Sequence, residues 1–478
     1  MPKPLVFNGF SMNCVSHVFH GAWRLPETKQ TEFNDLATWV ELARLLERGG
    51  FDALFLADVI GVDPAYRGSW DTYIEEAVQI PVNDSSTLIA ALIGSTEHLG
   101  LTFTSSILQD HPFSFARRVS TLDHLSRGRI GWNIVTSVSH NAAQNFGFER
   151  IVPHDERYRW AQEYLEVVYK LWEGSWDDDA LLVDKVRGLY ARPDAIHRIH
   201  HAGERYRVLG PHLTTPSPQR VPVLYQAGAS TAGRRFAAAH AEGTFIASQS
   251  PEGAARLTQA VRAQVREAGR HDDDLLFIQG MSFVVGSTEA EARQHARDQD
   301  EAVSQSGLAA HISRDLGVDL GLLDPDRPVD DLKIEGVQGL VRFFEEANPG
   351  VRPTVRNLVA MYARSGRLVG TPEAIADQLA AWQAAGIDGV NVMAQRTPHG
   401  FAEFIEHVMP VLRARGLARR EPATGTLRER LFPGRGPRLV ERHPATRYRQ
   451  AFRGQAAPQA LQDPQDPPAR HAAAPAGA

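Results

Sequence analysis

Small polar residues separate a strand-like run from a helix-like run in the segment 221–243, and they could bind a phosphate group. The apolar run at its start is typical of a buried strand, and apolar residues at helical spacing resume near its end. A strand that turns directly into a helix points free backbone N–H groups at one place, where the helix dipole adds partial positive charge. Gly228 and Ser230 lie in this turn, and Arg234 or Arg235 could add a cation. An ordinary capped helix after a core strand is the alternative explanation.

Three further apolar runs end in polar side chains that could face a bound ligand, because the carboxyl ends of parallel strands meet at one edge. A carboxylate or hydroxyl there could contact a cofactor ring. The structural alternatives are an aspartate that caps a loop and a buried hydroxyl that bonds to the strand backbone. The side chains are Asp58, Thr104, Ser106, Asn133, Thr136 and Ser137.

His154 and Tyr158 are four residues apart at the start of a long helix predicted over 157–172. This spacing places both side chains on one helical face if the helix has already begun at His154. A protonated imidazole and a phenol hydroxyl both suit a dianionic phosphate. Polar residues in solvent at the start of a helix are the alternative.

Several histidines could handle protons, because an imidazole with a pKa near neutrality gains and loses a proton readily. Each of them can instead be structural, and no cation near Cys14 in the sequence would activate its thiol. The candidate proton handlers are His17, His20, His140 and His311. A separate cluster has no cysteine or carboxylate at metal-ligand spacing, which indicates a solvated basic loop and no metal site. This cluster is His197, His200 and His201.

Strand-like and helix-like runs alternate from residue 4 to about 416, and this alternation must position the candidate side chains. Eight strand–helix units in one chain favour an α/β fold of the (β/α)8 TIM barrel type over a doubly wound sheet. The first predicted strand opens at Leu5. The others cover 51–58, 99–107, 129–137, 221–225, 244–248, 275–285 and 389–393.

The predicted barrel covers residues 1–416, with long insertions near 174–220 and 297–366 that interrupt the alternation. We expect both insertions to extend the loops that cover the mouth of the barrel. Residues 417–478 form an extension rich in Arg, Pro and Ala, with few large apolar residues. Its last 25 or so residues cannot bury enough surface to order themselves, so we expect them to be disordered.

The composition excludes several classes of partner and site. A net charge of −6 and a pI near 6.3 give no electrostatic case for nucleic acid or an anionic membrane as a partner. A single cysteine, Cys14, excludes an internal disulfide and a CxxC site. Because neither a signal peptide nor a membrane-spanning run is visible, we expect a soluble cytoplasmic protein.

Six motifs occur in consistent order over roughly residues 5–415. They are HGAWRLPE (20–27), FDALFLAD (51–58), TSSILQDHPFSFARRVSTLDHLSRGRIGWNIVTS (104–137), NFGFERIVPHDERYRWAQEYLEVVYKLWEG (145–174), QAGASTAGRRFAA (226–238) and GTPEAIADQL (370–379). Together they resemble the bacterial-luciferase-like flavin monooxygenases. The subgroup they resemble contains the nitrilotriacetate, EDTA, dibenzothiophene-sulfone and long-chain alkane monooxygenases.

This resemblance implies a luciferase-like barrel that binds reduced FMN, which a separate NAD(P)H:FMN reductase supplies. The reduced flavin would activate O2 as a C4a-(hydro)peroxide. One oxygen atom would then enter a small organic substrate by N-dealkylation, C–S cleavage or hydroxylation. The chain has neither GxGxxG after a strand nor GxxxxGK followed by Ser or Thr, so no nicotinamide site of its own is evident. The resemblance also implies a homodimer or a homotetramer.

The same resemblance assigns roles to individual residues. Asp58 would lie beside the isoalloxazine ring, and the backbone at Gly228 and Ala229 would complete the phosphate site. The full cofactor set is Asp58, Thr104, Ser106, Ser137, His154, Tyr158, Gly228 and Ser230. Four other residues fall where long-chain alkane monooxygenases place active-site residues. They are His17 and His311 as catalytic proton handlers, and Cys14 and Gln79 as substrate contacts.

Three other functions remain open from the sequence. A deazaflavin-dependent dehydrogenase of the same superfamily would transfer hydride and would not use oxygen. A flavin-binding protein without turnover would bind FMN and consume no substrate. A barrel with a phosphate site and unrelated chemistry, such as a sugar-phosphate enzyme, would not select reduced FMN.

Overall fold

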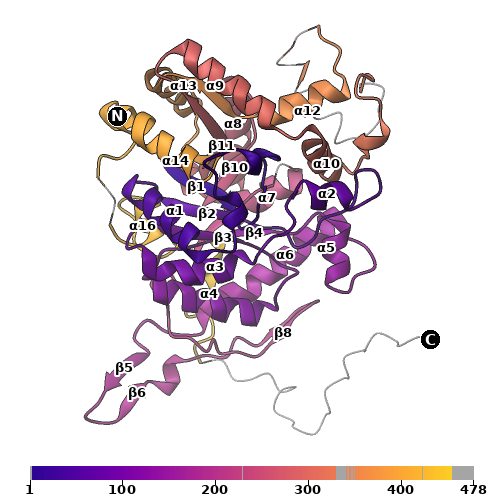
Figure 1. Cartoon of the computed structure of the whole chain (residues 1–478). Helices are drawn as coiled ribbons and strands as arrows, with labels where there is room; N and C mark the ends of the chain where they lie inside the picture. Colours follow the sequence, from indigo (N-terminus) through magenta and orange to yellow (C-terminus); the bar gives the residue numbers. More distant parts are fainter. Residues whose placement is uncertain are drawn as a thin grey trace, which may run out of the picture.

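Eight parallel strands close into a ring, which confirms the predicted (β/α)8 barrel (Figure 1). The computed structural model describes residues 3–228, 230–329, 341, 344–345, 348, 350–421 and 424–454. The ring order is β1-β2-β3-β4-β9-β10-β11-β13, and β13 pairs back with β1. The strands are β1 (Val6–Met12), β2 (Ala53–Ala57), β3 (Gly100–Ser106), β4 (Ile130–Val135), β9 (Val223–Gln226), β10 (Gly243–Ile246), β11 (Leu276–Val285) and β13 (Gly389–Met393).

Helices surround the ring because amphipathic segments connect its successive strands. Capping side chains fix where several of them begin; Asp35 and Asp84, for example, each accept a backbone N–H of the first helical turn. Within the described residues, no helix is both long enough and apolar enough to cross a membrane. The surrounding helices are α1 (Leu36–Arg48), α3 (Ser85–Leu92), α4 (Pro112–Ser126), α6 (His154–Tyr169), α7 (Thr231–His240), α8 (Pro251–Glu267), α13 (Pro372–Ala384), α14 (His399–Glu403) and α15 (Met409–Ala414).

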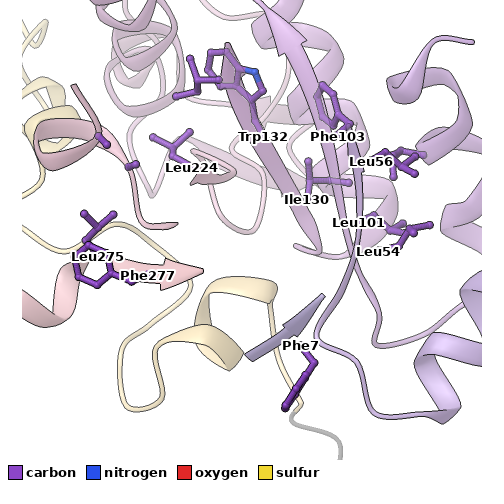
Figure 2. Packing of buried hydrophobic residues seen from close by; sticks show 14 of the residues in the cluster. Phe7, Leu54, Leu56, Leu101, Phe103, Ile130, Trp132, Leu224, Leu275 and Phe277 are labelled. Carbon is purple, nitrogen blue, oxygen red and sulfur yellow. The ribbon is translucent and has the colours of Figure 1, made fainter. Parts of the chain in front are cut away.

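Successive side chains of each strand point alternately towards the helices and into the barrel. Leu54, Leu56 and Phe103 belong to the main core that the helices cover (Figure 2). Phe55 and Tyr225 belong to the cluster inside the ring, where their ring centroids lie 5.2 Å apart. Because both faces of the strands are buried, the carboxyl ends of the strands are rigid supports for the polar residues that follow them.

The insertion near 297–366 reaches the mouth of the barrel, as predicted, because it follows the carboxyl end of β11. A further segment after β2, which the sequence did not reveal as an insertion, packs its α2 (Asp71–Glu75) against α10. The hydroxyl of Tyr73 in α2 donates to the carbonyl oxygen of Ala310 in α10 at 2.8 Å. The described elements of the insertion and its exit are α9 (Glu289–Ala302), α10 (Gln305–Leu316), α12 (Val355–Arg364) and β12 (Arg367–Gly370).

The insertion near 174–220 lies at the opposite end, so the prediction that it covers the mouth is wrong. It leads from the end of α6 into the start of β9, and a segment that leads from a helix into a strand lies at the amino ends of the strands. It forms two antiparallel hairpins, of which β5–β6 projects from the body (Figure 1). The hairpin strands are β5 (Leu181–Asp184), β6 (Leu189–Ala191), β7 (His201–Ala202) and β8 (Arg207–Val208).

Two histidines of this insertion correct the prediction of a solvated loop. His197 and His201 are buried, and their Nε2 atoms lie 3.2 Å from an oxygen of Asp177 and 3.4 Å from an oxygen of Glu163. Glu163 lies on α6, so spacing along the sequence could not reveal it as a partner of His201. Among the described residues, no cluster of three or more His, Cys, Asp or Glu side chains could hold a metal ion.

The described part of the C-terminal extension closes the amino end of the barrel. Leu427 and Leu431 of α16 (Leu427–Leu431), with Phe432, join the cluster inside the ring. Further arginines of the extension pair with carboxylates of the preceding chain; they are Arg435 and Arg442 on Asp274, Arg438 and Arg449 on Glu173, and Arg453 on Asp177. The residues beyond 454, which were predicted to be disordered, lie outside the described residues.

Candidate active site

A cavity of about 220 Å³ opens at the carboxyl ends of β2, β3, β4 and β9. It brings together residues from six separate segments of the chain. Gln226 at the end of β9 and Arg314 in α10 belong to its wall. Five of the eight predicted cofactor residues also line it, namely Asp58, Thr104, Ser106, Ser137 and Tyr158.

Asp58 follows β2 directly and points its carboxylate at the start of α3. Its Oδ2 accepts hydrogen bonds from the backbone N–H of Ser85 at 3.1 Å and from the Ser85 hydroxyl at 2.8 Å. Burial outweighs both bonds and raises the pKa of Asp58 to about 6. A carboxyl group that titrates just below neutral pH therefore lies at the edge of the cavity.

We expect Asp58→Asn to raise the free energy of unfolding by about 1–2 kcal/mol at pH 8 and to leave it nearly unchanged at pH 4. The folded-state pKa of about 6 lies above the ordinary value of 3.8 for an aspartate, so the folded protein keeps a proton that the unfolded chain releases between these values. The aspartate therefore costs stability as pH rises through this window, and the amide does not. Urea unfolding at pH 4, 5 and 8 measures the difference.

Asp84, the cap of α3, is the matched control for this prediction. Hydrogen bonds from Ser86 and Thr87 outweigh its burial and lower its pKa, so Asp84→Asn should lose stability at pH 8 relative to the wild type. If the difference in the free energy of unfolding between Asp58→Asn and the wild type stays constant with pH, the ionised Asp58 carboxylate does not destabilise the folded protein.

The hydroxyl groups on β3 and after β4 are held by their neighbours. Oγ1 of Thr104 donates to the carbonyl oxygen of Leu56 at 2.9 Å and accepts Nδ2 of Asn133 at 3.0 Å. The Ser137 hydroxyl donates to Oγ of Ser106 at 2.8 Å, and the backbone of Ser137 is left-handed with φ 57°. Thr104 therefore bonds to the neighbouring strand and also lines the cavity, to which the serine pair adds an ordered polar edge.

The turn from β9 into α7 is tightly packed against Tyr158 of α6. Oγ of Ser230 caps α7 by accepting the N–H of Gly233 at 3.0 Å. A Cβ on Gly228 would lie 2.8 Å from the Cα of Gly233, and a Cβ on Gly233 would lie 2.7 Å from the Tyr158 hydroxyl. Only glycine therefore allows the turn, the helix start and Tyr158 to meet. Ala229, predicted to contribute its backbone, lies outside the described residues.

Gln226 carries a polar atom whose partner is missing within the described part of the chain. The residue is 3% exposed, its Nε2 donates to the Tyr158 hydroxyl at 3.3 Å, and its Oε1 is buried with no hydrogen bond. A buried, unpaired carbonyl oxygen costs free energy unless a ligand supplies a donor. The cavity wall at the end of β9 is therefore built to meet an N–H or O–H group.

His154 is placed differently from the other predicted cofactor residues. Helix α6 begins at His154, so the side chains of His154 and Tyr158 share one face and their ring centroids lie 5.1 Å apart. The imidazole is exposed, and its Nδ1 lies 2.8 Å from an oxygen of Asp155. The predicted spacing is therefore correct, and only Tyr158 of the pair lines the cavity.

The family model of the luciferase-like monooxygenases matches residues 13–389, which is more than half of the chain. This chain belongs to the luciferase-like monooxygenase family. The match confirms the predicted resemblance and excludes an unrelated sugar-phosphate barrel.

Individual relatives of this luciferase-like monooxygenase agree with the family assignment. The chain is 43% identical over 451 residues to the long-chain alkane monooxygenase of Geobacillus thermodenitrificans (strain NG80-2), covering 94% of this chain and 99% of the relative. It is 34% identical over 431 residues to nitrilotriacetate monooxygenase component A of Aminobacter aminovorans, and the match covers 87% of this chain and 94% of the relative. A riboflavin lyase solved with modified FMN and riboflavin has a TM-score of 0.86 and 37% identity, covering 94% of this chain and 100% of that one. The chain is therefore a flavin-dependent monooxygenase.

A second cavity of this luciferase-like monooxygenase, of about 40 Å³, contains two of the residues that the resemblance assigned to substrate chemistry. Burial raises the pKa of the Cys14 thiol to about 12 and lowers the pKa of His17 to about 3, so both groups are neutral. Lys29 at the cavity binds Glu41 through its ammonium group at 2.5 Å. Most of the remaining wall is apolar and includes Phe10, Met12, Val15, Val18, Phe33, Trp39, Leu42 and Met393.

The other two residues assigned from the resemblance, His311 and Gln79, line neither of these two cavities. They lie in a buried hydrogen-bond network that also contains Arg314. Sequence reasoning missed Arg314 and the open oxygen of Gln226. Arg314 belongs to no motif and lies in a long insertion for which no helix was predicted. A helix there would have placed Arg314 on the same face as His311, three residues earlier.

Proposed function

We propose that this protein uses reduced FMN and O2 to insert one oxygen atom into a small organic substrate, as the oxygenase component of a two-component system. The observation that carries the proposal is the 220 Å³ cavity, which is lined by Tyr158 and by Gln226, the residue with the unpaired buried oxygen just before the glycine-bearing turn into α7. These features suit a flavin mononucleotide, which carries an anionic phosphate next to a ribityl chain with O–H donors.

The residues at the cavity fit this cofactor. Tyr158, Ser230 and the first N–H groups of α7 would hold the phosphate, because hydroxyl and backbone donors at a helix start favour an anion. Oε1 of Gln226, next to Tyr158, would accept an O–H of the ribityl chain, and Asp58 would lie beside the flavin ring. Thr104, Ser106 and Ser137 would border the ring, His154 would approach the phosphate from solvent, and Gly228 leaves room for the turn.

Bound reduced FMN supplies the two electrons that activate O2. The atoms balance when one oxygen enters the substrate, the other leaves as water, and FMN is released oxidised. The protein must keep this site dry and place protons correctly. His17 lines the second cavity near the mouth, beside Cys14; because burial lowers its pKa to about 3, its neutral ring would hydrogen-bond a substrate there and would not store a proton for transfer.

The test is a reconstitution with a separate reductase, and the name of the nitrilotriacetate relative, component A, agrees with a system of more than one protein. The chain with NADH and FMN alone should oxidise no substrate, and addition of an unrelated NADH:FMN reductase should start product formation with incorporation of one atom from 18O2. Product formed without the reductase would contradict the proposal. A cytoplasmic location belongs to the same proposal, since the lone Cys14 is free.

The second cavity favours an uncharged, apolar substrate. Its wall is mainly aliphatic, aromatic and sulfur-containing, its thiol and imidazole are neutral, and the ammonium of Lys29 is neutralised by Glu41. A polyanionic substrate would lose its hydration there without gaining a cation. The small volume further favours a short alkyl compound or thioether over a polycyclic one.

We also propose that the protein forms a homodimer or homotetramer through the β5–β6 hairpin. A two-stranded hairpin is marginal on its own, and this one exposes Leu182, Val183 and Val186, the last at 97%. A second copy could add its own hairpin and cover both apolar faces.

Val186→Asp with Leu182→Asp should lower the mass measured by light scattering to that of smaller species, while Val138→Asp on another exposed segment should not.

A further inference from the structure

Buried hydrogen bonds tie α10 of the insertion to the loop that follows β1. The Ser16 hydroxyl lies 2.6 Å from Nδ1 of His20, and Nε2 of His20 lies 2.6 Å from Nδ1 of His311. Nε2 of His311 lies 3.3 Å from Oδ2 of Asp315. Ser16, His20 and His311 are 1%, 0% and 3% exposed, so water does not compete for the bonds among these three residues, whereas Asp315 lies at the surface.

The network returns to the loop through the cavity wall. Oδ1 of Asp315 accepts Nε of Arg314 at 3.0 Å and Nη2 at 2.7 Å. Nη1 of Arg314 donates to Oε1 of Gln79, whose Nε2 donates to the carbonyl oxygen of His17 at 3.0 Å. The network therefore starts and ends at consecutive residues, Ser16 and His17, and forms a closed ring across three segments of the chain.

The chemistry of Asp315 fixes the direction of every donor in this ring. His311 and Arg314 hold the pKa of the Asp315 carboxyl far below its usual range, so it only accepts. Nε2 of His311 must then carry the proton, and its Nδ1 must accept from Nε2 of His20. Nδ1 of His20 in turn accepts the Ser16 hydroxyl. Burial lowers the pKa of both histidines, so both rings stay neutral with the proton on Nε2.

A direct consequence is that His311 has no ring nitrogen left for a ligand. Both of its nitrogen atoms are engaged inside the protein, whereas Arg314, one helical turn later, lines the 220 Å³ cavity. We propose that His20 and His311 are positioning residues, which act through Asp315 to hold the Arg314 guanidinium against the bound flavin. This role rests on the proposed function and replaces the proton-handling role that the resemblance gave to His311.

The affinity for oxidised FMN, measured by quenching of flavin fluorescence, tests this role without a substrate. Arg314→Met should weaken binding at least tenfold, because it removes a charge-assisted contact. His311→Leu should weaken binding to a similar extent, and the double variant should be no weaker than Arg314→Met alone. His311→Gln should stay within threefold of wild type, because its amide can accept from His20 and donate to Asp315.

Two results would overturn the positioning role while leaving the proposed function intact. The first is that the wild type binds FMN but His311→Gln loses as much affinity for it as His311→Leu does. The other is a double variant whose loss is the sum of both single losses. Failure of the wild type to bind FMN would instead refute the proposed function.

A second measurement needs no flavin. In the protein labelled with 15N in its histidine rings, His20 and His311 should both show the Nε2–H tautomer between pH 6 and 8. Their signals are assigned by loss in His20→Gln and His311→Gln. A proton on Nδ1 of His311 would contradict the donor directions assigned to the hydrogen-bond network, whatever the affinity for FMN.

Discussion

Arg428→Met should lower the free energy of unfolding by about 3–5 kcal/mol, although it lies at the end of the barrel opposite to the mouth. Arg428 is 2% exposed, and its guanidinium forms a two-bond ion pair with Glu242 at 2.7 and 2.8 Å. It also donates to the carbonyl oxygens of Val221, Pro222 and Pro437 at 2.7–3.0 Å. Methionine fills a similar volume but leaves a buried carboxylate and three carbonyl groups without their donor.

Urea unfolding measures this loss, and two further variants interpret it. The double variant Arg428→Met, Glu242→Gln should regain about 1 kcal/mol or more of the free energy of unfolding that Arg428→Met loses, because no uncompensated charge stays buried. Arg420→Met, at an exposed arginine of the same extension, should change stability by less than about 0.5 kcal/mol. A loss of equal size at Arg420 would show that the ion pair with Glu242 is not the cause.

Ser230→Ala combined with Tyr158→Phe should weaken FMN binding about 100-fold. Each variant removes a hydroxyl donor for the phosphate, and a hydrogen bond to a charged group contributes about 1.5 kcal/mol or more. The two hydroxyl groups lie at the same turn, because Gly233 is adjacent to the Tyr158 hydroxyl and donates its N–H to Oγ of Ser230. Calorimetric titration with FMN measures the loss, and riboflavin, which lacks the phosphate, should lose little affinity.

Ser250→Ala is the matched control for this double variant. Ser250 caps α8, in the next strand–helix unit, by accepting the N–H of Gly253 at 3.1 Å, which is the same bond that Ser230 makes in α7. It should cost about 1 kcal/mol of stability and leave FMN affinity unchanged. An equal loss of FMN affinity in Ser250→Ala would assign the effect to the lost cap and not to a phosphate contact.

The barrel was predictable because both faces of its strands are buried. Each ring strand is a short apolar run, so its position can be read without knowing its neighbours. The predicted strand 51–58 contains the observed strand Ala53–Ala57, and Gly389–Met393 was predicted to the residue. The polar residues after these runs were predictable for the same reason, and Asp58, Thr104 and Ser137 meet at one cavity.

The C-terminal extension could not be interpreted correctly, because its arginines are paired with carboxylates far away in the sequence. Arg428 meets Glu242, and Arg435 meets Asp274, so the charge balance is invisible along the chain. Arg314 was missed for a related reason, since only the packing of α10 brings it to the cavity. The insertion near 174–220 did carry a usable signal, because its place between a helix and a strand already assigned it to the amino ends.

The C-terminal extension also determines when, during translation, the barrel can reach its native structure. The first strand pairs with β13, near residue 390, and Leu427, Leu431 and Phe432 of the extension complete the apolar cluster inside the ring, together with strand side chains such as Phe55 and Tyr225. A nascent chain that has not yet reached Leu427 therefore lacks these three side chains, and apolar residues at the amino end of its barrel face water. We expect chaperones to bind the nascent chain until residues 427–432 have left the ribosome.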